Sequence, residues 1–231
     1  SIIDILDEEV AFDSKSIELL NWLSNYYQYP AGEVFFNFLP NLLSKQNNNF
    51  IENKLKTSKL LISKSKKLNI LTDEQKKSIK KINSLNKFDP LLINGVTGSG
   101  KTEIYLKSIE KVLKNNKSVL ILVPEINLIP QIFERFKLRF GDQIDKYHSK
   151  QSNKKNLNTW LKAKFGNTKI IIGTRSAVML PLKNLGMIII DEEHDDSYKQ
   201  NDGFRYSARD LAIKRAQVMD IPIILGSATP S

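Results

Sequence analysis

The sequence contains no cysteine, only two histidines and no long apolar run. Without cysteine, disulfides and cysteine-ligated zinc are excluded within these 231 residues, and a reducing cytosol is permitted. The longest apolar runs, such as Met187 to Ile190, are far shorter than the roughly 18 residues that a membrane-spanning helix needs. The opening SIIDILDEEV also lacks the basic region and apolar core of a signal peptide. We therefore expect a soluble, cytoplasmic protein with no membrane partner.

Acidic residues are outnumbered by basic ones, 25 to 35, which gives a formal net charge of +10. This excess fits a nucleic-acid partner, because phosphate backbones are bound largely through Lys and Arg. Most of the basic residues are lysine, and asparagine is also abundant. An AT-rich genome would produce the same bias without any binding function, so charge alone leaves both interpretations open.

The first 70 residues differ in composition from the rest of the chain. In residues 1–44, apolar side chains at helical spacing predict one amphipathic helix over 16–27, and a second helix is expected over 34–43. Residues 45–70 are rich in Lys, Asn and Ser, have Glu52 as their single acid, and are expected to be a basic linker. Because the chain begins at Ser1 rather than Met, we expect it to be the interior of a longer protein.

From residue 71 to residue 231, short apolar runs alternate with amphipathic stretches. This alternation predicts an α/β domain in which helices cover both faces of a mostly parallel sheet. The expected strands are residues 91–93, 119–123, 169–172, 187–190 and 223–225, and the expected helices are residues 101–113, 128–140, 156–164 and 208–219.

The segment GVTGSGKT follows the first expected strand and opens the next helix. Its glycines allow backbone N–H groups to surround a phosphate at the positive end of the helix dipole. We expect Lys101 to reach the β- and γ-phosphates of ATP and the Thr102 hydroxyl to bind Mg²⁺. The full set of expected ATP-binding residues in this loop is Gly95, Val96, Thr97, Gly98, Ser99, Gly100, Lys101 and Thr102.

A run of acids, Asp191, Glu192 and Glu193, followed by His194, comes directly after the strand that ends at Ile190. Ligands of open α/β folds bind at this edge of the sheet. Asp191 is expected to hold Mg²⁺, and Glu192 to orient and deprotonate the attacking water. The alternative is a solvated acidic loop.

Two weaker motifs flank these residues. The last expected strand runs into GSAT, which consists of Gly226, Ser227, Ala228 and Thr229. Its serine and threonine hydroxyls could sense the nucleotide state. Near residue 71, Thr72 and Gln75 have the spacing of a capping box, and Gln75 could instead read the adenine edge. The sequence leaves these two roles of Gln75 evenly balanced.

Taken in order, the segments TDEQ, GVTGSGKT, LVPEINLIPQ, GTRSAVMLP, DEEH, SYKQNDGFRYSARD and GSATPS resemble superfamily 2 helicases. More narrowly, they resemble the PriA family of replication-restart helicases. It covers residues 71–231, and NYYQYPAGEVFFNFLPNLL is similar to the segment before that family's winged helix. It implies a RecA-like first lobe that uses ATP and Mg²⁺, in a 3′ to 5′ DNA helicase that recognises stalled forks and initiates primosome assembly.

The resemblance also assigns roles and partners. It implies that His194 and the GSAT segment couple ATP turnover to movement. It implies contacts to DNA from Pro124, Thr174 and Arg175 and from an aromatic-rich loop that contains Tyr198, Lys199, Phe204, Arg205 and Tyr206. The alternative for the three aromatic residues is that they pack the loop onto the core. The implied partners are single-stranded and forked DNA, single-stranded-DNA-binding protein and other primosome proteins, in the nucleoid of a bacterial cytoplasm.

The chain departs from the family pattern in two places. Residues 45–70 are too few for the winged helix, which is expected to be absent or vestigial. The sequence stops at Ser231, directly after GSATPS, and so we expect these residues to lack the second lobe, with its arginine finger and zinc-binding cysteines. We therefore expect the fragment to bind ATP but hardly to hydrolyse it. The alternatives are another superfamily 2 DNA translocase, such as a fork-reversal or restriction motor, and a truncated non-catalytic DNA-binding or assembly module.

Overall fold

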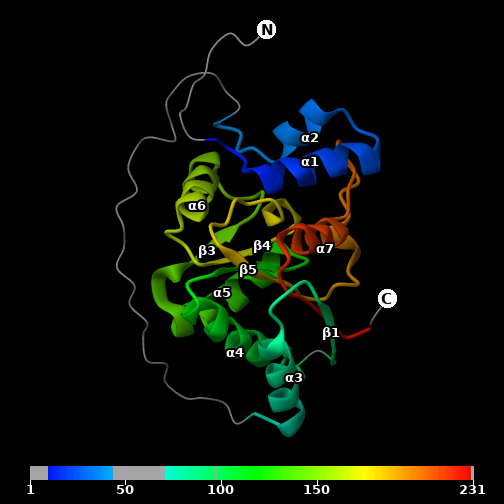
Figure 1. The fold of residues 1–231 in the computed structure, drawn as a ribbon. Coiled ribbons are helices and arrows are strands. Elements are labelled where there is room, and N and C mark those ends of the chain that lie inside the picture. Colours follow the sequence, from blue (N-terminus) through cyan, green and yellow to red (C-terminus); the bar gives the residue numbers. More distant parts are fainter. Residues whose placement is uncertain (1–9, 44–70, 97, 230–231) are drawn as a thin grey trace.

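A computed structural model describes residues 10–43, 71–96 and 98–229. The expected linker 45–70 lies outside these described residues. Figure 1 shows a twisted sheet with helices on both faces and the two N-terminal helices at one end of the molecule. Within the described ranges, no helix is long and apolar enough to cross a membrane.

The described chain forms seven α-helices and six strands. The helices are α1 (Ser14–Tyr27), α2 (Ala31–Asn37), α3 (Asp73–Ser84), α4 (Lys101–Lys114), α5 (Ile129–Phe140), α6 (Asn153–Phe165) and α7 (Ala208–Met219). The strands are β1 (Pro90–Asn94), β2 (Ser118–Leu122), β3 (Ile144–Tyr147), β4 (Ile170–Gly173), β5 (Leu185–Ile190) and β6 (Ile223–Ser227).

The six strands form one sheet in the order β1-β6-β5-β2-β4-β3, and every pairing is parallel. The central strands end in register, with Leu122 opposite both Gly173 on β4 and Ile190 on β5. The predicted α/β fold with a parallel sheet is confirmed. The segments that follow β1, β2, β4, β5 and β6 therefore meet at one edge, which is where the motifs lie.

Successive side chains of the strands pack into two separate cores. On β2, Leu120 and Leu122 belong to the core covered by α6, α7 and the N-terminal helices, whereas Val119 and Ile121 belong to the core covered by α3, α4 and α5. All four side chains are at most 1% exposed. A strand buried on both faces has no polar face, and so β2 reads as a continuous apolar run.

The structure adds one strand to those expected. Strand β3, with the sequence IDKY, lies at the edge of the sheet and only Ile144 is buried. Such a strand carries polar residues and no apolar run, so the sequence pattern did not predict it.

Local sequence determines where the helices begin and end. The Asp13 carboxylate accepts a hydrogen bond from Ser16 N at the start of α1, and Ser152 and Ser207 cap α6 and α7 in the same way. Helix α2 begins after Pro30 and ends at Asn37, earlier than the expected 34–43. Pro40 explains the early end, because a proline disfavours helical backbone in the residue before it.

The N-terminal helices share the core of the α/β domain. Leu19, Leu20 and Leu23 of α1 are fully buried and belong to the same cluster as Leu211 and Ala212 of α7. Residues 10–43 and the sheet domain are therefore joined by apolar packing, in addition to the chain between them.

Candidate nucleotide-binding site

The GVTGSGKT loop connects β1 to α4 at the carboxyl edge of the sheet. Its first residue donates a hydrogen bond from Gly95 N to Ser227 O, 2.9 Å, which ties the loop to the end of β6. Gly100 precedes α4 with φ 88°, a left-handed backbone that favours glycine. The loop thus enters the helix at the positive end of its dipole, the geometry that binds phosphate. Thr97, another expected ATP-binding residue, lies outside the described residues.

Gln75 performs the capping role and also reaches the loop. Its Oε1 accepts from Thr72 N at 3.0 Å, and the Thr72 hydroxyl accepts from Gln75 N, which completes the capping box. Its Nε2 donates to Ser99 O at 3.0 Å. A Cβ at Gly100 would lie 2.3 Å from that nitrogen. The structure therefore places Gln75 against the phosphate loop, while its expected contact with adenine stays a prediction.

Lys101 points back across the loop toward the acidic segment. Its Nζ donates to Gly95 O at 2.7 Å and lies 3.0 Å from Glu192 Oε1. The Lys101 residue is 7% exposed. The Glu192 carboxylate neutralises this almost buried ammonium group, so the lysine expected at the phosphates and the glutamate expected at the attacking water are direct partners.

Asp191 follows β5 and is held on both sides. Its backbone N donates to Leu122 O, 2.9 Å, and its Oδ1 accepts from the Tyr105 hydroxyl of α4 at 2.9 Å. Burial raises the pKa of the Asp191 carboxyl above its ordinary value, whereas the Tyr105 hydrogen bond and the Lys101 charge act in the opposite direction.

Glu192 turns the chain sharply after the strand. Its φ is 47°, the left-handed region that a residue with a side chain rarely adopts. The turn directs Oε1 to Lys101, and Oε2 accepts from Ala228 N at 3.3 Å. One carboxylate thus contacts both the phosphate loop and the GSAT segment.

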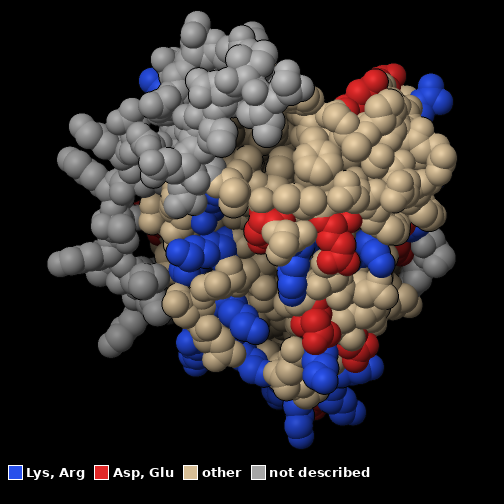
Figure 2. Space-filling view, turned by 45° about the horizontal axis from the view of Figure 1, so that its top comes forward, with Lys and Arg blue, Asp and Glu red and all other residues tan. Residues whose placement is uncertain are grey.

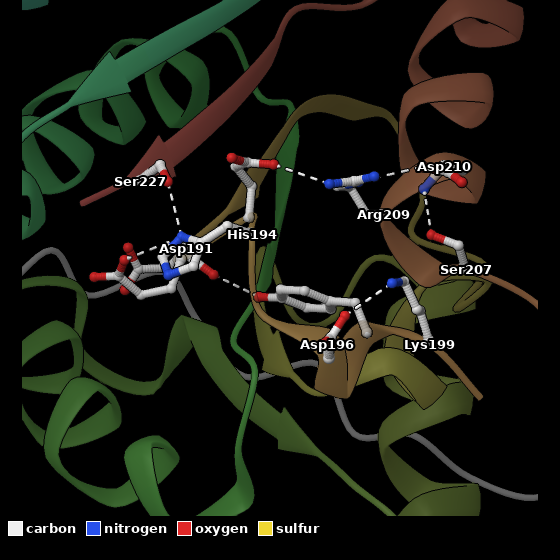
Figure 3. Close-up of polar contacts among 11 residues, drawn as sticks. Asp191, His194, Asp196, Lys199, Ser207, Arg209, Asp210 and Ser227 are labelled. Atoms are coloured by element: carbon white, nitrogen blue, oxygen red, sulfur yellow. Dashed lines mark hydrogen bonds and ion pairs between the residues drawn. The ribbon is translucent and has the colours of Figure 1, made fainter. Parts of the chain in front are cut away.

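His194 and Ser227 form the second link between the acidic segment and GSAT. His194 Nδ1 and Ser227 Oγ are 2.8 Å apart, and the same nitrogen is 3.9 Å from Glu192 Oε2. Figure 3 shows this contact reaching from the end of β6 to the acidic segment. Two of the residues expected to couple turnover to movement, His194 and Ser227, are therefore in contact, and the coupling role itself stays a prediction.

Glu193 faces away from the nucleotide side. It is 5% exposed, its carboxylate pairs with Arg209 of α7 at 3.2 Å, and its N donates to Gly226 O at 2.8 Å. Figure 3 shows Arg209 placed between this carboxylate and Asp210. Each of the three adjacent acids has its own partner, Tyr105, Lys101 or Arg209, which argues against a merely solvated acidic loop.

The expected DNA-path residues lie beyond the ends of β2 and β4. Arg175 donates from Nη1 to Ser197 O, 3.2 Å, and to Lys199 O, 3.1 Å. The Ser197 hydroxyl donates to Pro124 O at 2.9 Å. Thr174 is buried and Arg175 is half-buried. The structure brings these residues together with the start of the aromatic-rich loop, through backbone carbonyls.

The three aromatic residues of the loop are core residues in this structure. Tyr198, Phe204 and Tyr206 are 1%, 5% and 4% exposed. Tyr198 donates its hydroxyl to Asp191 O at 2.6 Å. A base cannot stack on a ring that protein already covers, so the expected stacking surface is not formed, and the packing alternative describes these rings. Lys199 and Arg205, between them in sequence, are exposed.

The N-terminal helices cover the aromatic loop. Phe204 makes edge contacts with Tyr27, Tyr29 and Phe38 at 6.0, 5.0 and 6.2 Å and stacks on Tyr206 at 5.2 Å. Two hydrogen bonds accompany the rings: Ser207 N donates to Tyr27 Oη, 3.1 Å, and Tyr29 Oη donates to Gly203 O, 2.9 Å. The loop is therefore clamped between α1–α2 and the sheet domain.

The donor set fits magnesium held together with a nucleotide. Thr102 stands in the first turn of α4, and Asp191 provides a carboxylate at the same edge. The part of the chain that the structure describes has no cluster of three His, Asp or Glu side chains suited to a metal. Mg²⁺ keeps several waters and takes one or two protein ligands plus phosphate oxygens, and the Thr102 hydroxyl and the Asp191 carboxylate are oxygen donors of that kind.

Sequence reasoning missed Tyr105 and the structural role of Tyr198, the two hydroxyls that hold Asp191. The sequence around Tyr105 does contain a signal that its hydroxyl needs a partner. Tyr105 lies on the buried face of α4 beside Ile104 and Leu106, where a tyrosine hydroxyl needs a polar partner. The identity of that partner depends on a contact across 86 positions.

Comparison with known protein families agrees with this geometry. A family model described as DEAD/DEAH box helicase matches residues 41–231. The chain belongs to the DEAD/DEAH box helicase family. A second model, described as the 3′ DNA-binding domain of PriA, matches residues 1–40.

Curated relatives narrow the family to PriA. Replication restart protein PriA of Haemophilus influenzae is 56% identical over 144 residues, which is 62% of this chain and 20% of that protein. The PriA of Rickettsia felis is 43% identical over 226 residues, 96% of this chain and 33% of that protein. The resemblance to PriA inferred from the motifs is confirmed. The chain spans between 20% and 40% of the length of such relatives.

Solved structures confirm the fold of this DEAD/DEAH box lobe. A DEAD box protein from the hyperthermophile Methanococcus jannaschii is 25% identical, with a TM-score of 0.53, over 69% of this chain and 44% of that chain.

Replacing Phe204 by Ala tests the packing of the aromatic loop. We expect a loss of about 3–5 kcal/mol in the free energy of unfolding, because a buried ring is removed from four aromatic neighbours. The matched control is Phe36→Ala on α2, whose ring is 63% exposed and whose loss we expect to stay within about 0.5 kcal/mol. Urea unfolding of both variants measures the difference, and equal losses would contradict the packing.

Proposed function

We propose that this chain is the ATP- and Mg²⁺-binding first lobe of a 3′ to 5′ DNA helicase that acts in replication restart. The observation that carries the proposal is the Lys101–Glu192 contact of 3.0 Å. Through it the phosphate loop meets the acidic segment, which also contacts GSAT through Ala228 and Ser227. No observation favours a non-catalytic module or a different superfamily 2 translocase.

Each residue of this network has a proposed role in hydrolysis. Lys101 counters the charge of the β- and γ-phosphates, and the loop N–H groups orient them. Glu192 accepts the proton of the attacking water. Thr102 and Asp191 hold magnesium, which when bound neutralises charge on the phosphate oxygens.

We expect nucleotide binding to rearrange the Lys101–Glu192 pair. In the structure the carboxylate occupies one donor direction of Lys101. A bound phosphate competes for the same ammonium group and frees Glu192 to face water. The contacts of Glu192 with Ala228 and of His194 with Ser227 would carry that change to GSAT. This is a route from phosphate occupancy to the segment expected to couple turnover with movement.

The DNA-binding role rests on the family match of residues 1–40 and on charge. The exposed cations Lys199 and Arg205 lie in the loop that is joined to Asp191 through Tyr198. Figure 2 shows one face of the molecule where Lys and Arg side chains gather over the lower half, interspersed with a few acids. Contacts of this kind address phosphates and carry no sequence preference, which suits a translocase on single-stranded or forked DNA.

The wider context of the parent protein is part of the same proposal. It places the helicase at the bacterial nucleoid, with single-stranded-DNA-binding protein and other primosome proteins as partners. Zinc is assigned to a second lobe, together with an arginine finger that would complete the ATPase site.

Replacing Lys101 by Ala tests the nucleotide site. We expect ATP binding by this chain to fall at least about 100-fold, since the substitution removes the charge that faces the phosphates. The control is Lys114→Ala, an exposed lysine at the far end of the same helix, which should bind ATP as the unchanged chain does. Isothermal titration calorimetry with MgATP measures both, and equal affinities would overturn the site.

Glu192→Gln in the full-length protein separates binding from turnover. The variant should bind ATP at least as tightly, because the carboxylate that competes for Lys101 loses its charge, while DNA-stimulated hydrolysis falls at least about 1000-fold. Glu134→Gln, at an exposed position on α5, is the control and should hydrolyse ATP normally. Undiminished turnover in Glu192→Gln would sink the assignment.

Arg205→Ala tests the DNA contact. Removing one phosphate-binding cation should lower the slope of log affinity against log salt for single-stranded DNA by about 0.7. Fluorescence anisotropy with labelled oligonucleotides at several salt concentrations gives the slope for this variant and for the Lys114→Ala control. A slope identical to the control would exclude Arg205 from the DNA path.

A further inference from the structure

Tyr105 is a buried polar side chain at the nucleotide site to which neither the motifs nor the family match assigns a role. It lies in the second turn of α4 and is 2% exposed. Its hydroxyl is 2.9 Å from Asp191 Oδ1, across the gap between α4 and the end of β5. A phenol can donate one hydrogen bond, and this carboxylate oxygen accepts it.

Tyr105 lies three positions after Thr102, so the two side chains share one face of α4. Thr102 is one proposed magnesium ligand, and Tyr105 holds the other, Asp191. Helix α4 therefore carries one proposed magnesium ligand, Thr102, and contacts the other, Asp191, through Tyr105. A shift of α4 would move the threonine hydroxyl and the aspartate carboxylate together.

Gly226 in GSAT leaves the space that the Tyr105 hydroxyl occupies. A Cβ at position 226 would lie 1.8 Å from Tyr105 Oη, 3.1 Å from its Cζ and 3.3 Å from Asp191 Oδ1. A heavy atom at 1.8 Å cannot be accommodated without displacing the hydroxyl. The glycine and the tyrosine are thus a matched pair, and the glycine keeps the hydrogen bond to Asp191 intact.

We propose that Tyr105 is a positioning residue for the magnesium site. Its hydrogen bond fixes the rotation of the Asp191 carboxylate, which is a proposed magnesium ligand. This inference rests on the proposed function, because it takes Asp191 as a ligand. An outer hydrogen bond of this kind orients a ligating carboxylate before the cation arrives and removes the cost of ordering it. Tyr105 itself contacts neither the phosphates nor the metal in this scheme.

The test is the magnesium dependence of nucleotide binding by Tyr105→Phe. A fluorescent, non-hydrolysable ATP analogue is titrated into the chain at a series of Mg²⁺ concentrations and in EDTA. We expect the half-saturating Mg²⁺ concentration to rise about tenfold, with binding in EDTA and the melting temperature close to those of the unchanged chain. Tyr147→Phe on the edge strand β3 is the matched control and should leave the Mg²⁺ dependence unchanged. An unaltered half-saturating concentration in Tyr105→Phe overturns the proposal.

Gly226→Ala provides an independent variant that displaces the same hydroxyl. It should raise the Mg²⁺ requirement as Tyr105→Phe does. In the double variant the nearest remaining ring atom is the Cζ at 3.1 Å, a contact that a small movement relieves. The double variant should therefore need no more Mg²⁺ than Tyr105→Phe alone, and should melt above Gly226→Ala. Additive effects of the two substitutions would overturn the pairing.

The outcomes separate this inference from the proposed function. If the unchanged chain binds the analogue no better with Mg²⁺ than with EDTA, the proposed ATP and magnesium site fails. If it binds with Mg²⁺ and Tyr105→Phe behaves identically, only the role of Tyr105 fails.

Discussion

Parallel strands end at the same edge of a sheet, and this constraint assembles every part of the nucleotide site. The phosphate loop follows β1, the acids follow β5, and GSAT begins in the last two residues of β6. These strands are neighbours in the order β1-β6-β5, although far apart in sequence. Backbone hydrogen bonds join the segments directly, from Gly95 N to Ser227 O and from Glu193 N to Gly226 O. The motifs therefore need no further scaffold to meet.

Charge balance determines how that edge is organised without a nucleotide. Lys101 is almost fully enclosed, and an isolated ammonium group there would be costly. Glu192 offsets this cost, at the expense of a left-handed backbone at its own position. The strain and the ion pair occur at the same residue, whose carboxylate reaches both Lys101 and Ala228 in the turned conformation.

The sequence was sufficient for the central strands and for the residues of the motifs, and insufficient for their neighbours. Strands β2 and β5 are continuous apolar runs, which only burial on both faces explains. Edge strand β3 lacks such a run. Helix α2 ends earlier than expected because of Pro40, and the spacing of apolar residues does not reveal that effect. Tyr105 and Phe204 find their partners across contacts of long sequence separation. Alternating aromatic and basic residues at 198–206 describe a stacking surface and a buried loop equally well, and only the position of α1 and α2 distinguishes them.

The clamp of α1 and α2 on the aromatic loop also imposes an order on folding. Phe38 contacts Phe204, and Tyr29 is hydrogen-bonded to Gly203, 174 positions away. During synthesis the N-terminal helices therefore wait on the order of ten to thirty seconds for their partners, at typical rates of translation. Their apolar faces, which include Leu19 and Leu23, have no completed core in that interval. The packing of α1 and α2 is therefore completed only after residue 204 has been synthesised.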